Sequence, residues 1–476
     1  ENREKLAAAS AIAAKTADYK NVFFLDIGKE FTTEDGTLPK ATMPDFLHLS
    51  RDAYFTEARA LEPSIAQLLG ETDAGKLPKG WVKLFNDQDL TGWKGLVENP
   101  FKRDALPAEE LAAKQKEADE NMKAHWHVED GVLHFDGKGQ NLCTARYYDD
   151  FEMIVDYKIK ENGDSGIYLR GSPQVQIWDP ASKNINGASA VGSGGLYNNK
   201  KNPSKPIAVA DHPAGDWNRF HIKMVGEKVT VWLNDILVTD HTVLENYWDY
   251  SKPIFDSGEI QLQNHGNDLW FKNVWVREIP RGDGWKDLIT GDLSNWEEIG
   301  GDKKTWAAEG DVIYTTGEKG GGWLSTKEQY SDFEFETEFK IPVNGNSGIY
   351  IRSPHDGGNP TFSGNEVQVL DDYGPEYHAP NHEIEPWQYC GSLYHTAQPS
   401  KRVSLPAGTW QKMYVKVVGP QITVRLNGFE IINDDMSKHP ELLKEHPGLA
   451  NTQGYVGFQN HGSRLDYRNI RIRPLK

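Results

Sequence analysis

The chain has 476 residues, a formal net charge of -18 at pH 7, and 45 glycines, 25 prolines and 15 tryptophans. This length exceeds what one hydrophobic core usually organises, so we expect two or three domains. The acidic balance argues against nucleic acid or an anionic membrane surface as a partner, and the sequence has no apolar run long enough to span a bilayer. The two cysteines, Cys143 and Cys390, lack metal-ligand spacing and are not expected to pair.

The first 78 residues predict a helix, a strand, a loop and a second helix in that order. The helices are expected in REKLAAASAIAAKTAD and RDAYFTEARALEPSIAQLLG, and the strand in NVFFLDIG at 21–28. The loop LPKATMPDFLHLS carries Asp45 and His48, three residues apart. This order is typical of the end of an α/β unit.

The D-x-x-H phrase formed by Asp45 and His48 resembles the last sequence block of SGNH (GDSL-like) hydrolases of the acetylhydrolase type. In that family an aspartate and a histidine at this spacing complete a Ser-His-Asp triad. The block that would supply the serine is missing from this sequence. The resemblance therefore implies that residues 1–78 are an inactive C-terminal fragment of such a domain. Part of a carbohydrate acetylesterase is the alternative.

The rest of the chain repeats one ordered series of nine sequence signals. The first series is DLTGW, WHVEDGVLHF, DDFEMIVDYKI, NGDSGIYLR, VQIWD, GGLY, PAGDW, VWLND and QNHG. The second is DLSNW, WAAEGDVIY, SDFEFETEFKI, NGNSGIYIR, VQVLD, GSLY, PAGTW, VRLNG and QNHG. Nine signals in the same order predict a duplicated domain, with one copy at 79–280 and the other at 281–476.

Each copy has the apolar periodicity of β-strands. FEMIVDYKI and FEFETEFKI alternate with period two, and clusters of Gly, Asn, Asp and Pro separate the short strands. We therefore predict a mainly β protein with two tandem jelly-roll sandwiches. One helix, over 105–126, is expected to decorate one end of the first sandwich, with a functional lid as the alternative.

Both copies resemble the 3-keto-disaccharide hydrolase domain family. The phrases that carry the resemblance are NGDSGIYLRGSPQVQIWD, GGLYNNKKNPSKP and QNHGNDLWFKNVWVREI in the first copy, and NGNSGIYIR, NEVQVLDDYG, GSLYHTAQPSK and QNHGSRLDYRNIRIRPL in the second. The resemblance implies concanavalin A-like jelly rolls and the cleavage of glycosides already oxidised to a ketone at C3. Such chemistry needs a base for the C2 proton, a group that holds the enolate oxygen, and an acid for the leaving group.

The strongest candidate for base or acid is Glu366, which strand alternation places on one face with Gln368. The first copy has Gln174 at the matching position, beside Gln176, and an amide cannot act as a base. This difference favours the second copy as the catalytic one. A solvated outer strand face is the alternative for Glu366.

Two further carboxylates follow the same strands at matched positions, Asp179 in the first copy and Asp371 in the second. We include both among the catalytic candidates.

The histidines and arginines that recur in both copies are the next candidates. His265 and His461, in the two QNHG phrases, could act as base, acid or metal ligand, or the phrase could be a turn whose side chains cap backbone groups. Arg170 and Arg352 could hold a ketone oxygen or an enolate, with a salt bridge across the sheet as the alternative.

Aromatic residues near glycine-rich loops are candidates for contact with a sugar ring. Tyr197 and Tyr394 follow GGL and GSL and could stack on sugar, donate a proton or pack in the core. Trp178, Trp323 and Trp387 do not recur between the copies and are expected in or beside loops, where they would stack on a pyranose face.

The leading interpretation is a carbohydrate-active enzyme that cleaves 3-keto-glycosides by hydrolysis, or by elimination and hydration. A non-catalytic carbohydrate-binding module is the main alternative. The expected partner is an oligosaccharide or glycoside, and no cofactor is expected. Ca²⁺ at Asp371–Asp372 or at HDGGN (355–359) is a minor alternative. Because the chain begins at Glu1 rather than at methionine, we expect a removed upstream segment and a secreted or periplasmic location.

Overall fold

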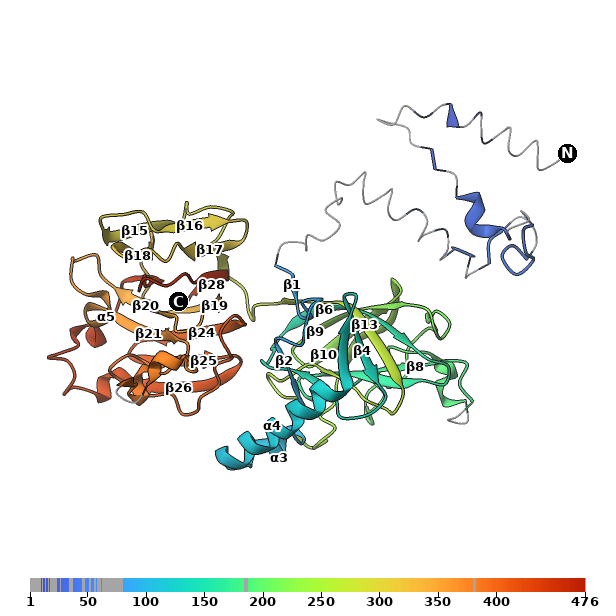
Figure 1. Ribbon diagram of the computed structural model, residues 1–476, viewed down its shortest axis with the longest axis horizontal. Helices are drawn as coiled ribbons and strands as arrows, with labels where there is room; N and C mark the ends of the chain where they lie inside the picture. Colours follow the sequence, from blue (N-terminus) through green and yellow to red (C-terminus); the bar gives the residue numbers. More distant parts are fainter. Residues whose placement is uncertain are drawn as a thin grey trace. The chain divides into compact units, whose positions relative to one another are not determined.

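The computed structural model describes residues 80–183, 187–379 and 382–475, together with short stretches of residues 1–79, of which 27–33 and 37–44 are the longest. Its contacts divide the chain into two units, residues 1–78 and 79–476 (Figure 1). No helix among the described residues is both long and apolar enough to cross a membrane.

The described positions of residues 1–78 agree only in part with the expected elements. Ser10, Ile12 and Ala14 are helical, as predicted. The strand expected at 21–28 is wrong at its described positions, because none of them is in a strand and the 3-10 helix η1 (Gly28–Phe31) begins at its end. A strand needs a neighbour for its backbone groups, and the described residues of this unit contain no strand that could pair with it.

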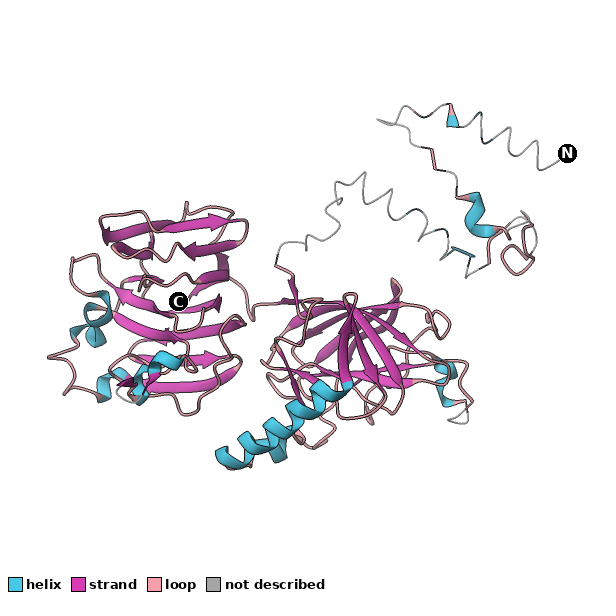
Figure 2. Ribbon diagram, in the orientation of Figure 1, coloured by secondary structure: helices cyan, strands magenta, loops and turns pink. Residues whose placement is uncertain are grey.

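The first repeat folds into a sandwich of two antiparallel sheets (Figure 2). The larger sheet has the order β11-β10-β9-β6-β13-β4-β3, with β1 paired to β13, and the smaller has the order β2-β5-β12-β7-β8. The strands are β1 Val82–Lys83, β2 Trp93–Gly95, β3 Trp126–Glu129, β4 Val132–Asp136, β5 Leu142–Thr144, β6 Phe151–Ile159, β7 Asp164–Leu169, β8 Ser172–Trp178, β9 Asn218–Val225, β10 Lys228–Leu233, β11 Ile236–Val243, β12 Gln261–Leu262 and β13 Asp268–Glu278.

The second repeat has the same topology, with the orders β16-β17-β28-β19-β24-β25-β26 and β15-β18-β27-β20-β21, and β14 paired to β28. The strands are β14 Lys286–Asp287, β15 Trp296–Gly301, β16 Trp306–Glu309, β17 Val312–Thr315, β18 Gly321–Thr326, β19 Phe333–Lys340, β20 Asn346–Ser353, β21 Asn365–Leu370, β22 His378–Ala379, β23 His382–Glu383, β24 Trp410–Val418, β25 Gln421–Leu426, β26 Phe429–Asp435, β27 Tyr455–Phe458 and β28 Asp466–Pro474. The predicted mainly β fold with two sandwiches is confirmed.

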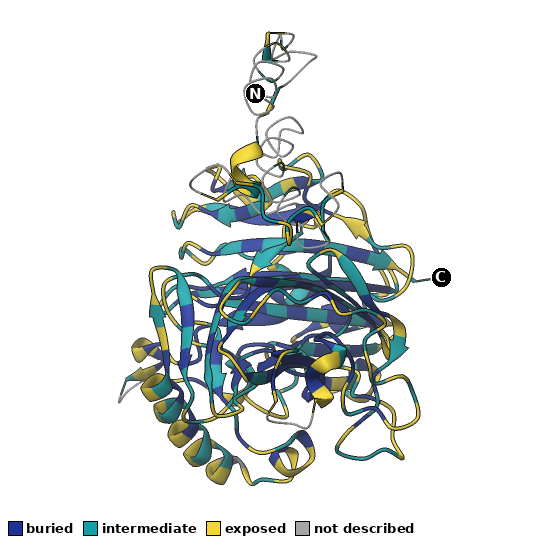
Figure 3. Ribbon diagram, turned by 90° about the vertical axis from the view of Figure 1, so that its right-hand side faces the viewer, coloured by how far each residue is buried: buried dark blue, intermediate teal, exposed yellow. Residues whose placement is uncertain are grey.

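Each sandwich has its own hydrophobic core. Two separate clusters of buried apolar side chains lie between the sheets, one drawn from residues 84–276 and the other from 288–472. The alternation read from the sequence produces them, because every second side chain of a strand such as β24 points inward and is buried. Figure 3 shows the buried strands of the sandwiches and a long helix exposed along one side.

The sandwiches differ in the helices inserted at the smaller sheet. The first carries α3 (Pro100–Asp104) and α4 (Ala108–His125), which confirms the helix predicted over 105–126. The second carries α5 (Pro360–Ser363) between β20 and β21. The short 3-10 helices are η2 Ala188–Val191, η3 Pro375–Tyr377, η4 Pro386–Gln388, η5 Met436–Lys438 and η6 Pro447–Ala450.

Candidate active site

The smaller sheet of the second sandwich has a polar outer face. Glu366 lies opposite Tyr350, and Tyr350 lies opposite Gly457, so these residues point to the same side of the sheet. In the next row Gln368 lies opposite Gly348. The inner face carries the apolar residues of the core, so these polar side chains lie on the side of the sheet that faces away from it.

Glu366, on β21, is almost fully enclosed, with 2% of its surface exposed. The Thr361 hydroxyl, from α5, donates a hydrogen bond of 2.7 Å to its Oε2. Burial raises the pKa of Glu366 to about 7, and the Thr361 hydrogen bond opposes part of that rise. A Cβ at Gly348 would lie 2.0 Å from Oε1, so glycine is needed beneath the carboxyl group.

A chain of polar side chains runs from the QNHG phrase to this carboxyl group. The Gln459 amide donates to the Tyr350 hydroxyl at 2.9 Å. The Tyr350 hydroxyl lies 3.5 Å from Thr361 Oγ1, at the outer limit of a hydrogen bond, and Thr361 donates to Glu366. Burial, together with the charge of Glu366, raises the pKa of Tyr350, so its hydroxyl keeps its proton at neutral pH.

Two predicted aromatic residues lie beside Glu366. The backbone N–H of Tyr394 donates to the Glu366 carbonyl, and burial and the Glu366 charge raise the pKa of the Tyr394 hydroxyl. Trp387, in η4, meets the Tyr394 ring edge-on at 4.9 Å. The structure therefore brings Glu366, Gln368, Tyr394 and Trp387 together around β21, as the strand pattern predicted for the first two.

The matching face of the first sandwich also carries a carboxyl group, but at a different position. Gln174 takes the place of Glu366, and its amide donates to Gln176 Oε1. The Gln176 amide donates in turn to Asp164 at 2.7 Å. Burial raises the pKa of Asp164, while His265, 3.7 Å from its carboxylate, and the Gln176 hydrogen bond lower it.

The position of Asp164 holds Asn346 in the second sandwich, where the Gln368 amide donates to Asn346 Oδ1 at 2.9 Å. A glutamine therefore lies between the same two positions in both sandwiches. The first has Asp164 and an amide at 174, and the second has an amide at 346 and Glu366. Each sandwich therefore has one acidic residue beside the central glutamine. In the first it occupies the position of Asp164, and in the second the position of Glu366.

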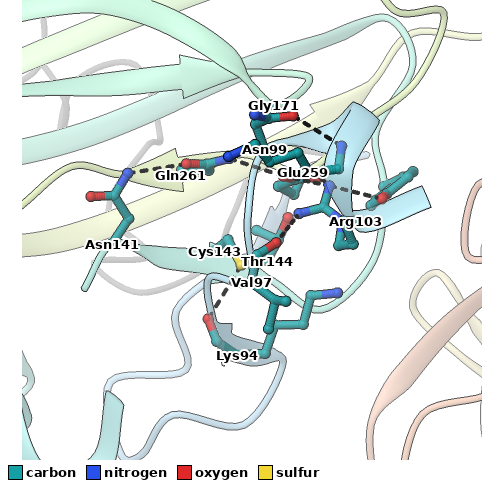
Figure 4. Close-up of polar contacts among 12 residues, drawn as sticks. Lys94, Val97, Asn99, Arg103, Asn141, Cys143, Thr144, Gly171, Glu259 and Gln261 are labelled. Atoms are coloured by element: carbon teal, nitrogen blue, oxygen red, sulfur yellow. Dashed lines mark hydrogen bonds and ion pairs between the residues drawn. The ribbon is translucent and has the colours of Figure 1, made fainter. Parts of the chain in front are cut away.

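Only part of the first sandwich's face is open. Arg103, from α3, forms a buried ion pair with Glu259, with both carboxylate oxygens 2.9 Å from its Nη2 (Figure 4). Gln261 donates to Glu259, and Asn141 donates to Gln261, so this network fills one end of the sheet. At the other end Trp178 meets Tyr197 edge-on at 5.4 Å beside a cavity of about 250 Å³.

The profile of the family described as the 3-keto-alpha-glucoside-1,2-lyase-like domain matches residues 80–277 and again 284–473. This chain belongs to that family. A protein of Bacteroides thetaiotaomicron named 3-keto-disaccharide hydrolase is 23% identical over 267 residues, covering 44% of this chain and 83% of the relative.

Two of the solved structures that the chain resembles are the following. One, from Parabacteroides distasonis and named "Putative glycosyl hydrolase", is 26% identical with a TM-score of 0.35, and the match covers 40% of this chain and 100% of that one. The other, the carbohydrate-binding module CBM66 from Bacillus subtilis, is 12% identical with a TM-score of 0.22 over 38% of this chain and 95% of that one.

Asp179 and Asp371 both accept hydrogen bonds from loop backbone at the ends of their strands. Asp179 accepts hydrogen bonds from the backbone N–H groups of Asn162 and Ala181, and Asp371 accepts one from Asn344. Each carboxylate fastens the loop at the end of its strand, an arrangement common for aspartate in turns.

Arg170 and Arg352 are also structural. Both have left-handed backbone conformations, with φ of 52° and 48°, and both are buried. Arg170 pairs with Asp150, and Arg352 pairs with Asp332 at 2.9 Å and donates to three backbone carbonyls. The alternative of a salt bridge fits both residues, since their guanidinium groups are occupied by protein acceptors.

The two QNHG phrases form turns at matched positions of the two sandwiches. Asn264 and Asn460 accept from the N–H two residues ahead and so form the turn. The glutamines face the two matched tyrosines, Gln263 donating to Tyr168 at 3.2 Å. His265 and His461 are exposed at the edge of the sheet, and His265 is the one that faces an acid, Asp164.

The remaining expected residues are placed as follows. Trp323 is buried within β18, not in a loop, and meets Tyr350 edge-on at 5.4 Å. Asp372, the neighbour of Asp371, accepts from the Cys390 N–H and from Ser404, so its oxygens serve hydrogen bonds that a Ca²⁺ ion would compete for.

The SGNH-like pair and the two cysteines are the last of the expected positions. His48 is exposed, and Asp45 lies outside the described residues. Cys143 and Cys390 are both free and buried.

The sequence interpretation missed Thr361 and Asp164. Thr361 lies in α5, in the segment that makes the second copy longer between NGNSGIYIR and VQVLD, and this difference in length is the signal that could have found it. Asp164 differs from Asn346 by a single substitution within the repeated phrase, which is a signal of the same kind as the pair Gln174 and Glu366.

Proposed function

We propose that the second sandwich cleaves 3-keto-glycosides, with Glu366 as the general base. The observation that supports this is a single carboxyl group enclosed on the polar sheet face, with its pKa raised to about 7. A base works best when its pKa lies near the working pH, because it is then partly ionised and still strong enough to take a proton. Membership of the family supports the substrate class.

The reaction begins with the proton on C2, which the neighbouring C3 ketone makes acidic. Glu366 takes that proton, and the electron pair moves into the C2–C3 bond while the ketone oxygen becomes an enolate. The enolate then expels the C1 substituent, which leaves with a proton, and water adds across the resulting double bond. No oxidant is consumed, because the ketone is already present in the substrate.

Two tyrosines are assigned the remaining roles. Tyr350 donates its hydroxyl proton toward the enolate oxygen, since its own oxygen accepts from Gln459. Tyr394, beside Trp387, supplies the proton for the leaving group. Both have raised pKa values, which keep the hydroxyls protonated at neutral pH.

The proposal is tested by assaying the chain with a 3-keto-glucoside and, in parallel, with its unoxidised parent glucoside. The wild-type chain should cleave the ketone and leave the parent intact. Glu366→Gln should lower turnover about 100-fold or more, because an amide cannot take the proton. Glu430→Gln, an exposed glutamate of the larger sheet, is the matched control and should keep full activity.

Three results would count against the proposal. Equal cleavage of the unoxidised parent would remove the ketone from the mechanism. Full activity in Glu366→Gln, with loss in His265→Ala, would place the chemistry in the first sandwich. Binding of glycosides without any turnover would favour the carbohydrate-binding alternative.

A further inference from the structure

The short helix α5 brings Thr361 to the Glu366 carboxyl group, and its own position depends on its neighbours. It has four residues, fewer than an isolated helix needs to form in water. The Asn359 side chain accepts from the Thr361 N–H at its first turn, and the Gly364 N–H donates to the Pro360 carbonyl at its end. The carbonyl groups of its last turn need donors from elsewhere in the sandwich.

The segment between β26 and β27 supplies those donors. His446 Nε2 lies 2.9 Å from the Gly364 carbonyl oxygen, and the Asn451 amide donates to the Ser363 carbonyl at 2.7 Å. A Cβ at Gly448 would lie 1.9 Å from the Gly364 oxygen, so the two backbones touch at this point. Because a carbonyl oxygen only accepts, the imidazole carries a proton on Nε2. His446 and Asn451 thus hold the C-terminal end of α5.

The same imidazole also contacts the loop that carries Tyr394. Its Nδ1 lies 3.2 Å from the Thr396 hydroxyl, which in turn lies 3.3 Å from the Tyr394 carbonyl oxygen. Thr361 and Tyr394 come from the two elements beside Glu366. A single side chain, that of His446, therefore connects both of these elements.

His446 is buried and uncharged. It is 3% exposed, and burial lowers its pKa, although the hydrogen bond to the Gly364 carbonyl opposes part of that change. The titratable groups that face it are His395, whose charge lowers the pKa further, and Glu445, which lines the same cavity of about 190 Å³. The ring is therefore neutral at pH 7, and its Nδ1 can accept from the Thr396 hydroxyl.

In the described part of the first sandwich nothing corresponds to α5 or to His446. There the chain passes from β7 through Arg170 and Gly171 directly into β8, without a helix. The segment between β11 and β12, residues 244–260, contains no histidine. The helix and the histidine therefore occur together in the copy that has a carboxyl group, Glu366, where the other has Gln174.

We infer that His446 is a positioning residue for Glu366, because it fixes α5 so that Thr361 keeps its hydrogen bond to the carboxyl group. The consequence for catalysis rests on the proposed function of the second sandwich, whereas the effect on the carboxyl group does not. Without His446 the end of α5 loses a donor and Thr361 withdraws. Glu366 then lacks the hydrogen bond that favours its ionised form, so it ionises at a higher pH.

The ionisation of Glu366 can be measured without substrate. Each variant is melted from pH 5 to pH 9 beside the same variant carrying Glu366→Gln, and the pH at which the difference in melting temperature stops growing is the ionisation pH. His446→Phe should raise it by about one unit. His446→Gln, whose amide can still donate to the Gly364 carbonyl, should keep the wild-type value. His439→Phe, at a histidine that contacts Asp434, is the matched control and should also keep it.

A double variant and a pH–rate profile separate positioning from general damage to the fold. Thr361→Val combined with His446→Phe should have the ionisation pH of Thr361→Val alone, because both changes act through one hydrogen bond. With a 3-keto-glucoside, His446→Phe should lower turnover about tenfold at pH 6 and change it little at pH 9, with KM unaltered. A raised ionisation pH without turnover in any of the proteins would support the positioning role and refute the proposed function.

Three results would overturn the inference. They are a folded His446→Phe with the wild-type ionisation pH, a double variant shifted beyond Thr361→Val, and a shift in His446→Gln as large as that in His446→Phe. If His446→Phe does not fold, NMR of the histidine-labelled wild-type chain decides. The His446 signal, assigned by its absence from His446→Gln, should show a neutral ring protonated on Nε2 at pH 7, and a proton on Nδ1 would contradict the assignment.

Discussion

Replacing Glu366 by glutamine should make the chain more stable at alkaline pH while it removes activity. The carboxyl group is almost fully buried, and its pKa is raised from 4.5 to about 7. A shift of that size corresponds to a penalty of about 3 kcal/mol for holding the charge in the folded state. Glutamine has the same shape and carries no charge, so the penalty disappears.

The direction of the effect follows from which state binds the proton. Between pH 4.5 and about 7 the folded state keeps the proton of Glu366 and the unfolded state has lost it. Wild-type stability therefore falls as pH rises through this window, and the loss is complete above about pH 7. The variant lacks this slope, so the gain from Glu366→Gln is under about 1 kcal/mol at pH 5 and about 3 kcal/mol at pH 8.

Thermal melting at a series of pH values measures the gain as a difference between variant and wild type. For a domain of this size the difference at pH 8 is on the order of 10 °C. Gln174→Glu is the mirror control, because a carboxyl group placed at the matching position should destabilise the chain with the same pH dependence. A melting difference that stayed constant from pH 5 to pH 8, or a variant less stable than wild type at pH 8, would refute the reasoning.

Three further outcomes are expected. Turnover of a 3-keto-glucoside should rise about tenfold between pH 6 and pH 8 as Glu366 ionises. Thr361→Val should move the midpoint of this pH profile upward, because the hydrogen bond that favours the ionised carboxylate is lost. A flat pH profile of the wild type would contradict this. Gly348→Ala should reduce turnover at least tenfold with folding retained, because the new Cβ would collide with the Glu366 carboxyl oxygen. Kinetics measures the loss of turnover, and thermal melting checks that the variant folds. Arg352→Lys should cost roughly 2 kcal/mol or more of stability, because lysine cannot make the same set of hydrogen bonds. The turnover of the folded fraction should not change. An unchanged denaturation midpoint would argue against this prediction.

The sequence predicted the two sandwiches because a strand's alternation is a local property. In FEFETEFKI every second residue is apolar except Thr337, and in the structure residues 333–340 of that stretch form β19 in the larger sheet. The helix over 105–126 was equally local. The strand expected at 21–28 shows the limit, because an apolar run forms a strand only where another strand can pair with it.

The candidate site was predicted only where strand alternation decides it. Glu366 and Gln368 follow from the pattern of β21 alone. Thr361 could not be placed, because it reaches the carboxyl group through α5, whose path depends on tertiary packing. The position of Asp371 just past the strand is the same for a catalytic carboxylate and for a turn cap, and only the structure shows that it accepts from the backbone N–H groups of Asn344 and Tyr373.

The exchange of acid and amide around the central glutamine has a consequence for redesign. Converting Asn346 to Asp, or Gln174 to Glu, replaces an NH₂ group by oxygen and leaves side-chain volume almost unchanged. Each sandwich thus offers four isosteric states, with no acid, one acid at either position, or two that would have to share a proton. A set of single and double variants could therefore vary the charge of the face one step at a time on a backbone that already accommodates both arrangements.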